Sequence, residues 1–186
     1  SAPLYMLLWP LFSQAAGAKF FAATVPLINA ARLYLSSKAT DADDDAELSA
    51  AVSRSGDRAE AAGGPLIYVN IMSLAILWEW RSSAVAIVAL STMEAGDGLE
   101  DLIGRRLGKN NPWPTSLTGS SNRKSVAGSA ALVVASVITS TGLLQWLQYW
   151  GCVELPLPLL PILLVKLTVV AAVEAFFELI PVADDY

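Results

Sequence analysis

The sequence has 186 residues and a formal net charge of −5; 54% of the residues are hydrophobic, 16% are charged, and the mean hydropathy is +0.50. An ordinary soluble domain carries about a quarter charged residues, so this composition indicates an integral membrane protein. The single cysteine, Cys152, and the lack of histidine exclude a disulfide framework, a Cys/His zinc site and a histidine base.

Nearly charge-free runs predict the helices. In chain order they cover residues 2–18, 20–31, 65–78, 82–93, 126–150 and 155–173, the last broken only by Lys166. A helix needs about 20 residues to cross the hydrocarbon core, which 126–150 meets alone and 155–173 meets with Lys166 included. Small residues are frequent over 125–142, as in transmembrane helices that pack closely. We therefore predict an all-α fold, a polytopic integral membrane helical bundle with about five or six hydrophobic segments. Aromatic residues near the run ends resemble an interfacial belt: Trp9, Trp78, Trp80, Trp146, Tyr149 and Trp150.

The organisation expected from the sequence is a single domain over residues 1–186. Because the chain enters an apolar segment at once after Ser1, we expect it to lack an N-terminal part of a longer protein. Residues 36–64, which include the acidic run DADDDAE (41–47), are predicted to form a mobile acidic loop. Residues 100–124 hold five of the twelve basic residues and are predicted to form a basic catalytic loop. The parity of the crossings places both loops and the acidic C-terminus at one membrane surface.

The stretch EAGDGLEDLIGRRLGKNN (94–111) concentrates charge directly after an apolar run. On a helix continuing from residue 82, Asp97, Asp101 and Arg105 follow one another at single-turn spacing on one stripe. Two carboxylates followed by arginines suit a hydrated Mg²⁺ ion and phosphate groups, so Asp97 and Asp101 are candidate metal ligands and catalytic acids. Glycines in the stretch, Gly96 and Gly98 among them, let backbone N–H groups approach an anion. The alternative is structural, with Asp101 and Arg105 forming an ordinary ion pair along the helix.

A second polar stretch, NRKSVAGS (122–129), enters the long run 126–150. Lys124 and Ser125 at the start of a helix offer a cation, a hydroxyl and free N–H groups to phosphate. The alternative is that Ser125 only caps the helix. Neither polar stretch has the spacing of a Walker A loop. Lys166 and Glu174 lie within the last run, where a structural pair and a polar path through the membrane are both open interpretations.

These residues resemble a known family. AGDGLEDLIGRRLG followed by NRKSVAGSAA is similar to the signature of the phytol and farnesol kinases of plants and algae. That family belongs to the polyprenol kinase group, which includes dolichol kinase and is related to CDP-diacylglycerol synthase. SRSGDRAEAAGGPLIY (53–68) and EAFFELIPVADDY (174–186) extend the resemblance over nearly the whole chain.

The resemblance implies a membrane kinase that phosphorylates an isoprenoid alcohol, with CTP as the usual donor and Mg²⁺ required. It implies that Asp97 and Asp101 handle metal and phosphate. It also implies a chloroplast membrane location, and nothing in the sequence points to nucleic acid. The residues that it assigns to the nucleotide phosphates, by contact or by giving them room, are Gly96, Gly98, Arg105, Arg106, Lys124, Ser125 and Gly128.

The expected function is therefore CTP-dependent phosphorylation of phytol or a similar alcohol to its monophosphate. Two alternatives stay open at this point. One is a cytidylyltransferase that acts on a lipid phosphate, as in the related synthases. The other is a non-catalytic membrane carrier, with Lys166 and Glu174 lining its path.

Overall fold

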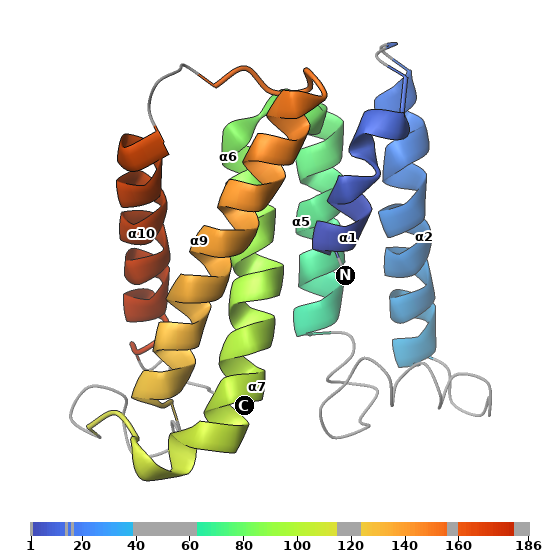
Figure 1. Ribbon diagram of the computed structural model, residues 1–186. Helices are drawn as coiled ribbons and strands as arrows, with labels where there is room; N and C mark the ends of the chain where they lie inside the picture. Colours follow the sequence, from blue (N-terminus) through green and yellow to red (C-terminus); the bar gives the residue numbers. More distant parts are fainter. Residues whose placement is uncertain are drawn as a thin grey trace. The chain divides into compact units, whose positions relative to one another are not determined.

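A computed structural model describes residues 2–13, 15, 17–38, 63–114, 124–155 and 160–180. Its helices are labelled in Figure 1. The described residues form no strand, and one isolated antiparallel bridge joins Pro112 to Ser125. The chain divides into two compact units, one made of Ser1–Trp9 and Ser82–Tyr186 and the other of Pro10–Arg81. The prediction of an all-α fold is thereby confirmed for the described part of the chain.

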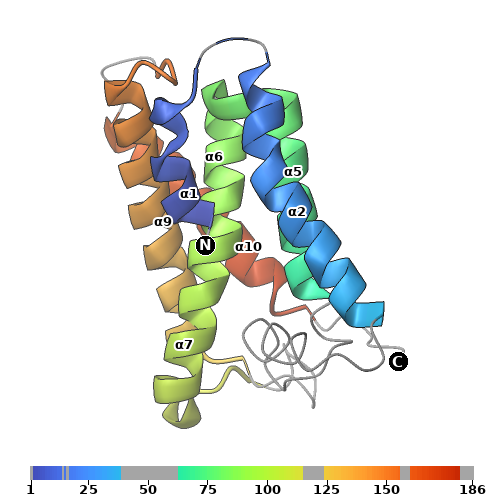
Figure 2. The same ribbon diagram turned by 90° about the vertical axis from the view of Figure 1, so that its right-hand side faces the viewer.

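The unit Pro10–Arg81 is built on two helices, α2 (Ala18–Lys38) and α5 (Gly64–Glu79), which lie side by side in Figure 2. The hydrophobic side chains buried in this unit include Ala22, Ala23, Leu33, Met72 and Ile76. The helix α5 ends at Glu79, and the residue that caps it, Trp80, has a φ of 50°. Two cations bind backbone carbonyls within this unit: the Lys19 ammonium donates to the Leu77 oxygen at 3.0 Å, and the buried Arg81 guanidinium donates to the Phe12 oxygen at 2.9 Å. Short 3₁₀ turns, Trp9–Leu11 and Trp80–Ser82, stand near its two ends.

The other unit contains a nearly continuous helical rod. It consists of α6 (Ala84–Ser91), the π-helical turn η3 (Thr92–Gly96) and α7 (Asp97–Leu107), and a 3₁₀ turn, η4 (Gly108–Asn110), follows it. Ser83 caps its start, because the Ser83 hydroxyl accepts from the Ala86 N–H at 3.3 Å. The predicted helix from residue 82 through the charged stretch is therefore confirmed. The π turn changes which side chains of α7 face the neighbouring helices, since it inserts extra backbone into the helical register.

The helix α9 (Val126–Tyr149) is central to the same unit and contacts α6, α7, α1 (Ala2–Leu7) and α10 (Leu160–Phe177). Its buried face alternates leucines with serines and alanines. The small residues allow α7 to come close: a Cβ atom added at Gly96 would collide with the Ser136 hydroxyl. The fully buried large side chains around α9 are Met6, Trp9, Ile87, Leu90, Leu132, Leu144 and Leu147.

By length and composition, α9 is the one described helix able to cross a membrane, and Gly64–Trp78 is apolar but shorter. The number of crossings stays a prediction. The aromatic residues divide between two environments. Trp9 is buried in the core, whereas Trp78, Trp146, Tyr149 and Trp150 are exposed.

The structure differs from the predicted boundaries of both loops. The basic loop was predicted to begin at residue 100, which is wrong, because residues 100–107 complete α7 and polar side chains there lie on a helix. The acidic loop was predicted over 36–64, but 36–38 end α2 and Gly64 begins α5. Residues 39–62 and 115–123 lie outside the described part of the chain, and with them lie Arg123 and the acidic run 41–47.

Candidate functional site

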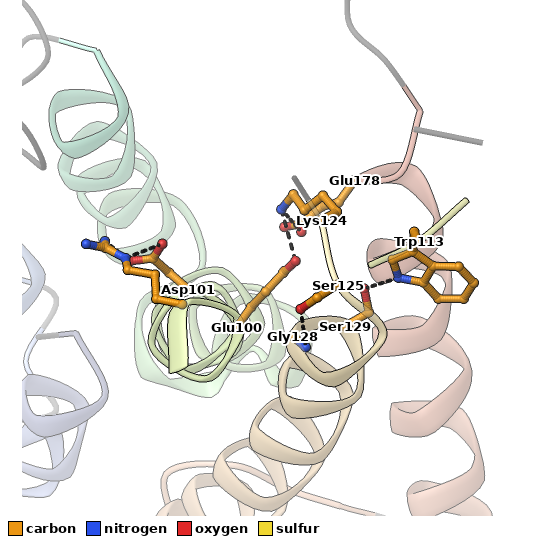
Figure 3. Close-up of polar contacts among 9 residues, drawn as sticks. Glu100, Asp101, Trp113, Lys124, Ser125, Gly128, Ser129 and Glu178 are labelled. Carbon is orange, nitrogen blue, oxygen red and sulfur yellow. Dashed lines mark hydrogen bonds and ion pairs between the residues drawn. The ribbon is translucent and has the colours of Figure 1, made fainter. Parts of the chain in front are cut away.

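A cluster of charged side chains forms where the start of α7, the start of α9 and the end of α10 meet. The ammonium of Lys124 lies 3.0 Å from Oε1 of Glu100 and 2.7 Å from Oε2 of Glu178. Figure 3 shows Glu100 extending from α7 toward Lys124 and Glu178. These three residues are separated by 24 and 54 positions in the chain, so only the packing of the three helices brings them together.

Asp97 completes the cluster. Ligand oxygens of Asp97, Glu100 and Glu178 all lie within 4.8 Å of one another. Glu100 is 4% exposed, and its second oxygen, Oε2, is buried without a hydrogen-bond partner. Gly128 leaves room for the Glu100 side chain, because a Cβ atom at Gly128 would lie only 3.2 Å from Glu100 Cγ. Three carboxylates therefore share the neighbourhood of one ammonium.

The pKa values of Glu100 and Lys124 reflect burial and the presence of several carboxylates near one ammonium. Burial, and then a hydrogen bond with the Glu178 carboxyl, raise the pKa of Glu100 to about 7, although Lys124 acts in the opposite direction. For Lys124, burial lowers the pKa, but the hydrogen bonds to Glu178 and Glu100 outweigh it and leave the pKa above its ordinary value. The ammonium thus stays charged at neutral pH while Glu100 titrates there. A further cation near Glu100 would favour the ionised carboxylate.

Ser125 and Gly128 form the turn beside Lys124. The buried Ser125 hydroxyl caps α9 by accepting from the Gly128 N–H at 3.1 Å. Two backbone hydrogen bonds join the turn to the segment that follows η4. The Val126 N–H donates to the Asn111 oxygen and the Trp113 N–H donates to the Lys124 oxygen, both at 3.0 Å. Ser125 therefore caps α9, as one of the two interpretations of the sequence predicted.

The glycines of the motif fall into two groups. Gly96 and Gly128 lie where α7 and α9 touch, and an added Cβ atom would meet Ser136 at the first and Glu100 and Ser125 at the second. Gly98 is exposed, with nothing within 4 Å of such an atom. Close helix packing accounts for Gly96 and Gly128, and the nucleotide role of all three stays a prediction.

Asp101 lies away from this cluster. It forms an ion pair with Arg105 one turn along α7, and the Arg105 Nε donates to Asp101 Oδ1 at 3.0 Å. In Figure 3 Asp101 lies on the side of α7 that faces away from Lys124. The structure therefore shows the ordinary ion pair along the helix that was the alternative interpretation of Asp101 and Arg105. Arg105 and Arg106 are both exposed.

Of the residues predicted for the site, the structure brings together Asp97, Lys124 and the adjoining turn Ser125–Gly128. Sequence reasoning missed Glu100 and Glu178. A signal for Glu100 was present, because it is an acid about one turn after Asp97 and directly follows Leu99. Nothing in the sequence indicated how Glu178 would lie relative to α7.

Lys166 and Glu174 form no direct pair, because eight residues of helix separate them by about 12 Å along the axis of α10. Lys166 is exposed, whereas Glu174 is half-buried and lies close enough to Asp97 and Glu178 to interact electrostatically with both. Asp57, Glu60, Asp184 and Asp185 lie outside the described residues.

Comparison with known proteins shows relatives among the plant isoprenoid kinases. The chain is 38% identical over 156 residues to "Probable phytol kinase 1, chloroplastic" of Glycine max, covering 83% of this chain and 49% of that protein. It is 37% identical over 185 residues to "Probable phytol kinase, chloroplastic" of Triticum aestivum, covering 99% of this chain and 58% of the relative. With "Farnesol kinase, chloroplastic" of Arabidopsis thaliana the identity is 31% over 182 residues, covering 98% and 55%.

No family model matches the sequence, and no solved structure matches the chain. The chain spans about half the length of the curated relatives that it matches. The similarity nonetheless extends over most of this chain. Over most of its length the chain is therefore similar to the plant phytol and farnesol kinases.

Proposed function

We propose that the protein is a membrane-bound kinase that transfers the terminal phosphate of a nucleotide, CTP by the family resemblance, to the hydroxyl of phytol, farnesol or a similar isoprenoid alcohol. The observation that carries this proposal is the polar cluster of Asp97, Glu100, Lys124 and Glu178 at one end of an otherwise apolar group of helices. Such an arrangement suits a substrate with a charged reaction centre and a long hydrocarbon tail.

The apolar surface supports a membrane setting. In the unit that holds the cluster, α10 exposes a series of large hydrophobic side chains, and α9 has the length and composition of a crossing helix. Water disfavours this much exposed hydrocarbon, whereas lipid tails and the tail of a prenyl alcohol do not. The α10 residues concerned are Ile162, Val165, Val169, Val170, Val173, Phe176 and Phe177. A chloroplast membrane is the proposed location, because the printed names of the relatives include "chloroplastic".

The proposed reaction is an in-line displacement. The alcohol oxygen forms a bond to the terminal phosphorus, the bond from that phosphorus to the bridging oxygen breaks, and the nucleoside diphosphate leaves. The hydroxyl proton passes to a nearby carboxylate, for which Asp97 is the candidate, and from there to solvent. Lys124 is the side chain of the cluster able to bind a phosphate oxygen, as a point charge.

A divalent metal ion fits the residues of the cluster. Carboxylate oxygens are the ligands that Mg²⁺ takes from proteins, and Glu100 Oε2 is a buried acceptor without a partner. When bound, Mg²⁺ would offset the negative charge that moves from the transferred phosphate to the leaving group. Of the two acids assigned to it by the family resemblance, Asp97 lies in the cluster and Asp101 pairs with Arg105.

The test uses the full-length protein in membranes, with phytol, farnesol and geranylgeraniol as acceptors and, in parallel, with the monophosphates of these alcohols. CTP labelled at the γ-phosphate should label the lipid, whereas CTP labelled at the α-phosphate should not. The reverse pattern identifies a cytidylyltransferase, and the absence of label from either donor favours a carrier. Asp97→Asn should abolish labelling at unchanged expression, and the matched control Glu154→Gln, an exposed acid beyond α9, should label as the wild type does.

A further inference from the structure

The charged cluster already contains a cation, and that cation belongs to the protein. The Lys124 ammonium lies within hydrogen-bond distance of two of the three carboxylates, at 3.0 Å from Glu100 and 2.7 Å from Glu178. Lys124 is also the residue best suited to hold a nucleotide phosphate. Two of the three N–H donors of this ammonium contact carboxylates, and the negative charge of these carboxylates repels an incoming phosphate, so Lys124 binds phosphate poorly in this arrangement. Without a nucleotide, Lys124 therefore binds Glu100 and Glu178 instead of phosphate.

The acids around Lys124 have the spacing of ligands to one metal ion. Oxygens that bind a single divalent cation at 2.0–2.6 Å stand up to about 4–5 Å apart across it. Asp97, Glu100 and Glu178 each offer an oxygen, and these oxygens lie within 4.8 Å of one another. A cluster of acids alone is common on protein surfaces, but this one is enclosed. Glu100 is 96% removed from solvent, since it is 4% exposed, and its Oε2 has no hydrogen-bond partner.

The buried carboxylate of Glu100 is incompletely satisfied. Its Oε1 shares the Lys124 ammonium with Glu178, and its Oε2 is a buried acceptor without a hydrogen-bond partner, which costs free energy. A divalent ion would add positive charge at this position. It would also give Glu100 Oε2 the partner that it lacks, because that oxygen does not bind Lys124.

We propose that Asp97, Glu100 and Glu178 form a divalent-metal site, and that Lys124 holds this site in the metal-free state and is released to the nucleotide phosphate when the metal binds. The inference rests on the proposed kinase function, since it describes how the same cluster accepts a metal–nucleotide complex. It assigns the metal to Glu100 and Glu178 in place of Asp101. In this scheme the metal and Lys124 exchange partners, so that free nucleotide binds weakly and the metal-bound nucleotide binds well.

The first experiment measures metal binding without turnover. The full-length protein in lipid nanodiscs is titrated with Mn²⁺, and free Mn²⁺ is followed by electron paramagnetic resonance. Glu100→Gln and Glu178→Gln should each weaken Mn²⁺ binding by about tenfold or more, since each removes a charged ligand. Lys124→Gln should strengthen it by a similar factor, because the competing ammonium is gone. Glu154→Gln, the exposed control, and Asp101→Asn should leave the Mn²⁺ affinity within about twofold of the wild type.

The second experiment measures CTP binding in the presence of EDTA, by equilibrium dialysis. Glu100→Gln and Glu178→Gln should bind CTP more tightly than the wild type when no metal is present, since Lys124 is held less firmly. Lys124→Gln should bind it weakly with or without Mn²⁺. A purely structural ion pair would not produce a gain of CTP affinity from loss of an acid.

Each opposite result overturns the inference. If Asp101→Asn weakens Mn²⁺ binding while Glu100→Gln and Glu178→Gln do not, the metal is held by Asp97 and Asp101, and the kinase proposal stands without the exchange. If Lys124→Gln leaves Mn²⁺ affinity unchanged or lowers it, Lys124 does not compete with the metal. A thermal-unfolding curve accompanies each variant, and Glu178→Gln, at a partly exposed position, supplies the measurement if Glu100→Gln does not fold. Loss of the proposed kinase function would appear separately, as absent lipid labelling in a protein that still binds Mn²⁺.

Discussion

The ammonium of Lys124 lies 3.0 Å from the buried carboxylate of Glu100, and this contact ties the start of α9 to the inner face of α7. It places a residue of the second polar stretch against a residue of the first. Because Lys124 also reaches Glu178, the same side chain fixes the end of α10. The contact with Glu100 is half-shielded from solvent, so salt screens it less than it screens the exposed pair of Asp101 and Arg105.

The stability of the metal-free protein should fall as the pH rises from about 5 to 7. The pKa of Glu100 is about 7 in the folded protein and 4.5 in an ordinary glutamate, so folding favours the protonated carboxyl. The stabilisation from this group is therefore complete below pH 4.5 and is lost as the pH rises through 7. The measurement is the apparent unfolding temperature in detergent with EDTA at pH 5 to 8. The neighbouring charges, Lys124, Glu178 and Asp97, are retained in the comparison variant Glu100→Gln, which should show a flatter profile. An unchanged slope in that variant would contradict the assignment.

Replacing Gly96 should destabilise the packing of α7 on α9. In Gly96→Ala the new Cβ atom overlaps the Ser136 hydroxyl and lies 3.4 Å from Leu132 Cγ, so we expect a loss of about 1–3 kcal/mol. Gly98→Ala is the matched control, because nothing lies within 4 Å of its Cβ atom and alanine favours a helix by up to about 1 kcal/mol. Both are measured by thermal unfolding in detergent.

Ser136→Ala removes the hydroxyl with which the Gly96→Ala methyl collides. The double variant should recover most of the stability lost in Gly96→Ala. Equal stability of Gly96→Ala and Gly98→Ala would show that the two helices do not approach closely at residue 96.

Asp97 and Asp101 should differ in their importance for activity, although they stand one turn apart. Asp97→Asn changes a member of the charged cluster, and we expect lipid labelling to fall by about 10²-fold or more. Asp101→Asn breaks an exposed ion pair with Arg105, which contributes only about 0.3–0.5 kcal/mol, so we expect a much smaller loss. The measurement is the initial rate of labelling with γ-labelled CTP at matched expression. An equal loss of labelling in the two variants would show that Asp101 also acts in the catalytic site.

Ser125→Ala should destabilise the protein more than Ser83→Ala, although both serines cap helices in the same way. Ser125 accepts from the Gly128 N–H at 3.1 Å, and Ser83 accepts from the Ala86 N–H at 3.3 Å. A lost cap costs about 1 kcal/mol, and more where the capping hydrogen bond is buried, as at Ser125, than where it is only partly buried, as at Ser83. Thermal unfolding of the two variants checks the order, and the reverse order would show that the Ser125 cap contributes little.

The sequence allowed several parts of this structure to be predicted. The apolar runs marked the helices, and the spacing of Asp97, Asp101 and Arg105 placed them correctly on one helix. It also identified Lys124 and Ser125 at the start of α9. What could not be predicted is which side chains of α7 face α9. Adjacent residues on a helix point about 100° apart, and the π turn Thr92–Gly96 shifts that register before α7 begins. Glu100 therefore faces inward, and Asp101, the next residue, faces outward.

Local physical chemistry thus determined the helices, their caps and the ion pair of Asp101 with Arg105, because each depends on residues within a turn or two of one another. The partnership of Glu100, Lys124 and Glu178 depended on the docking of α7, α9 and α10. Such docking is decided by how closely small residues let the backbones approach, which sequence spacing does not encode.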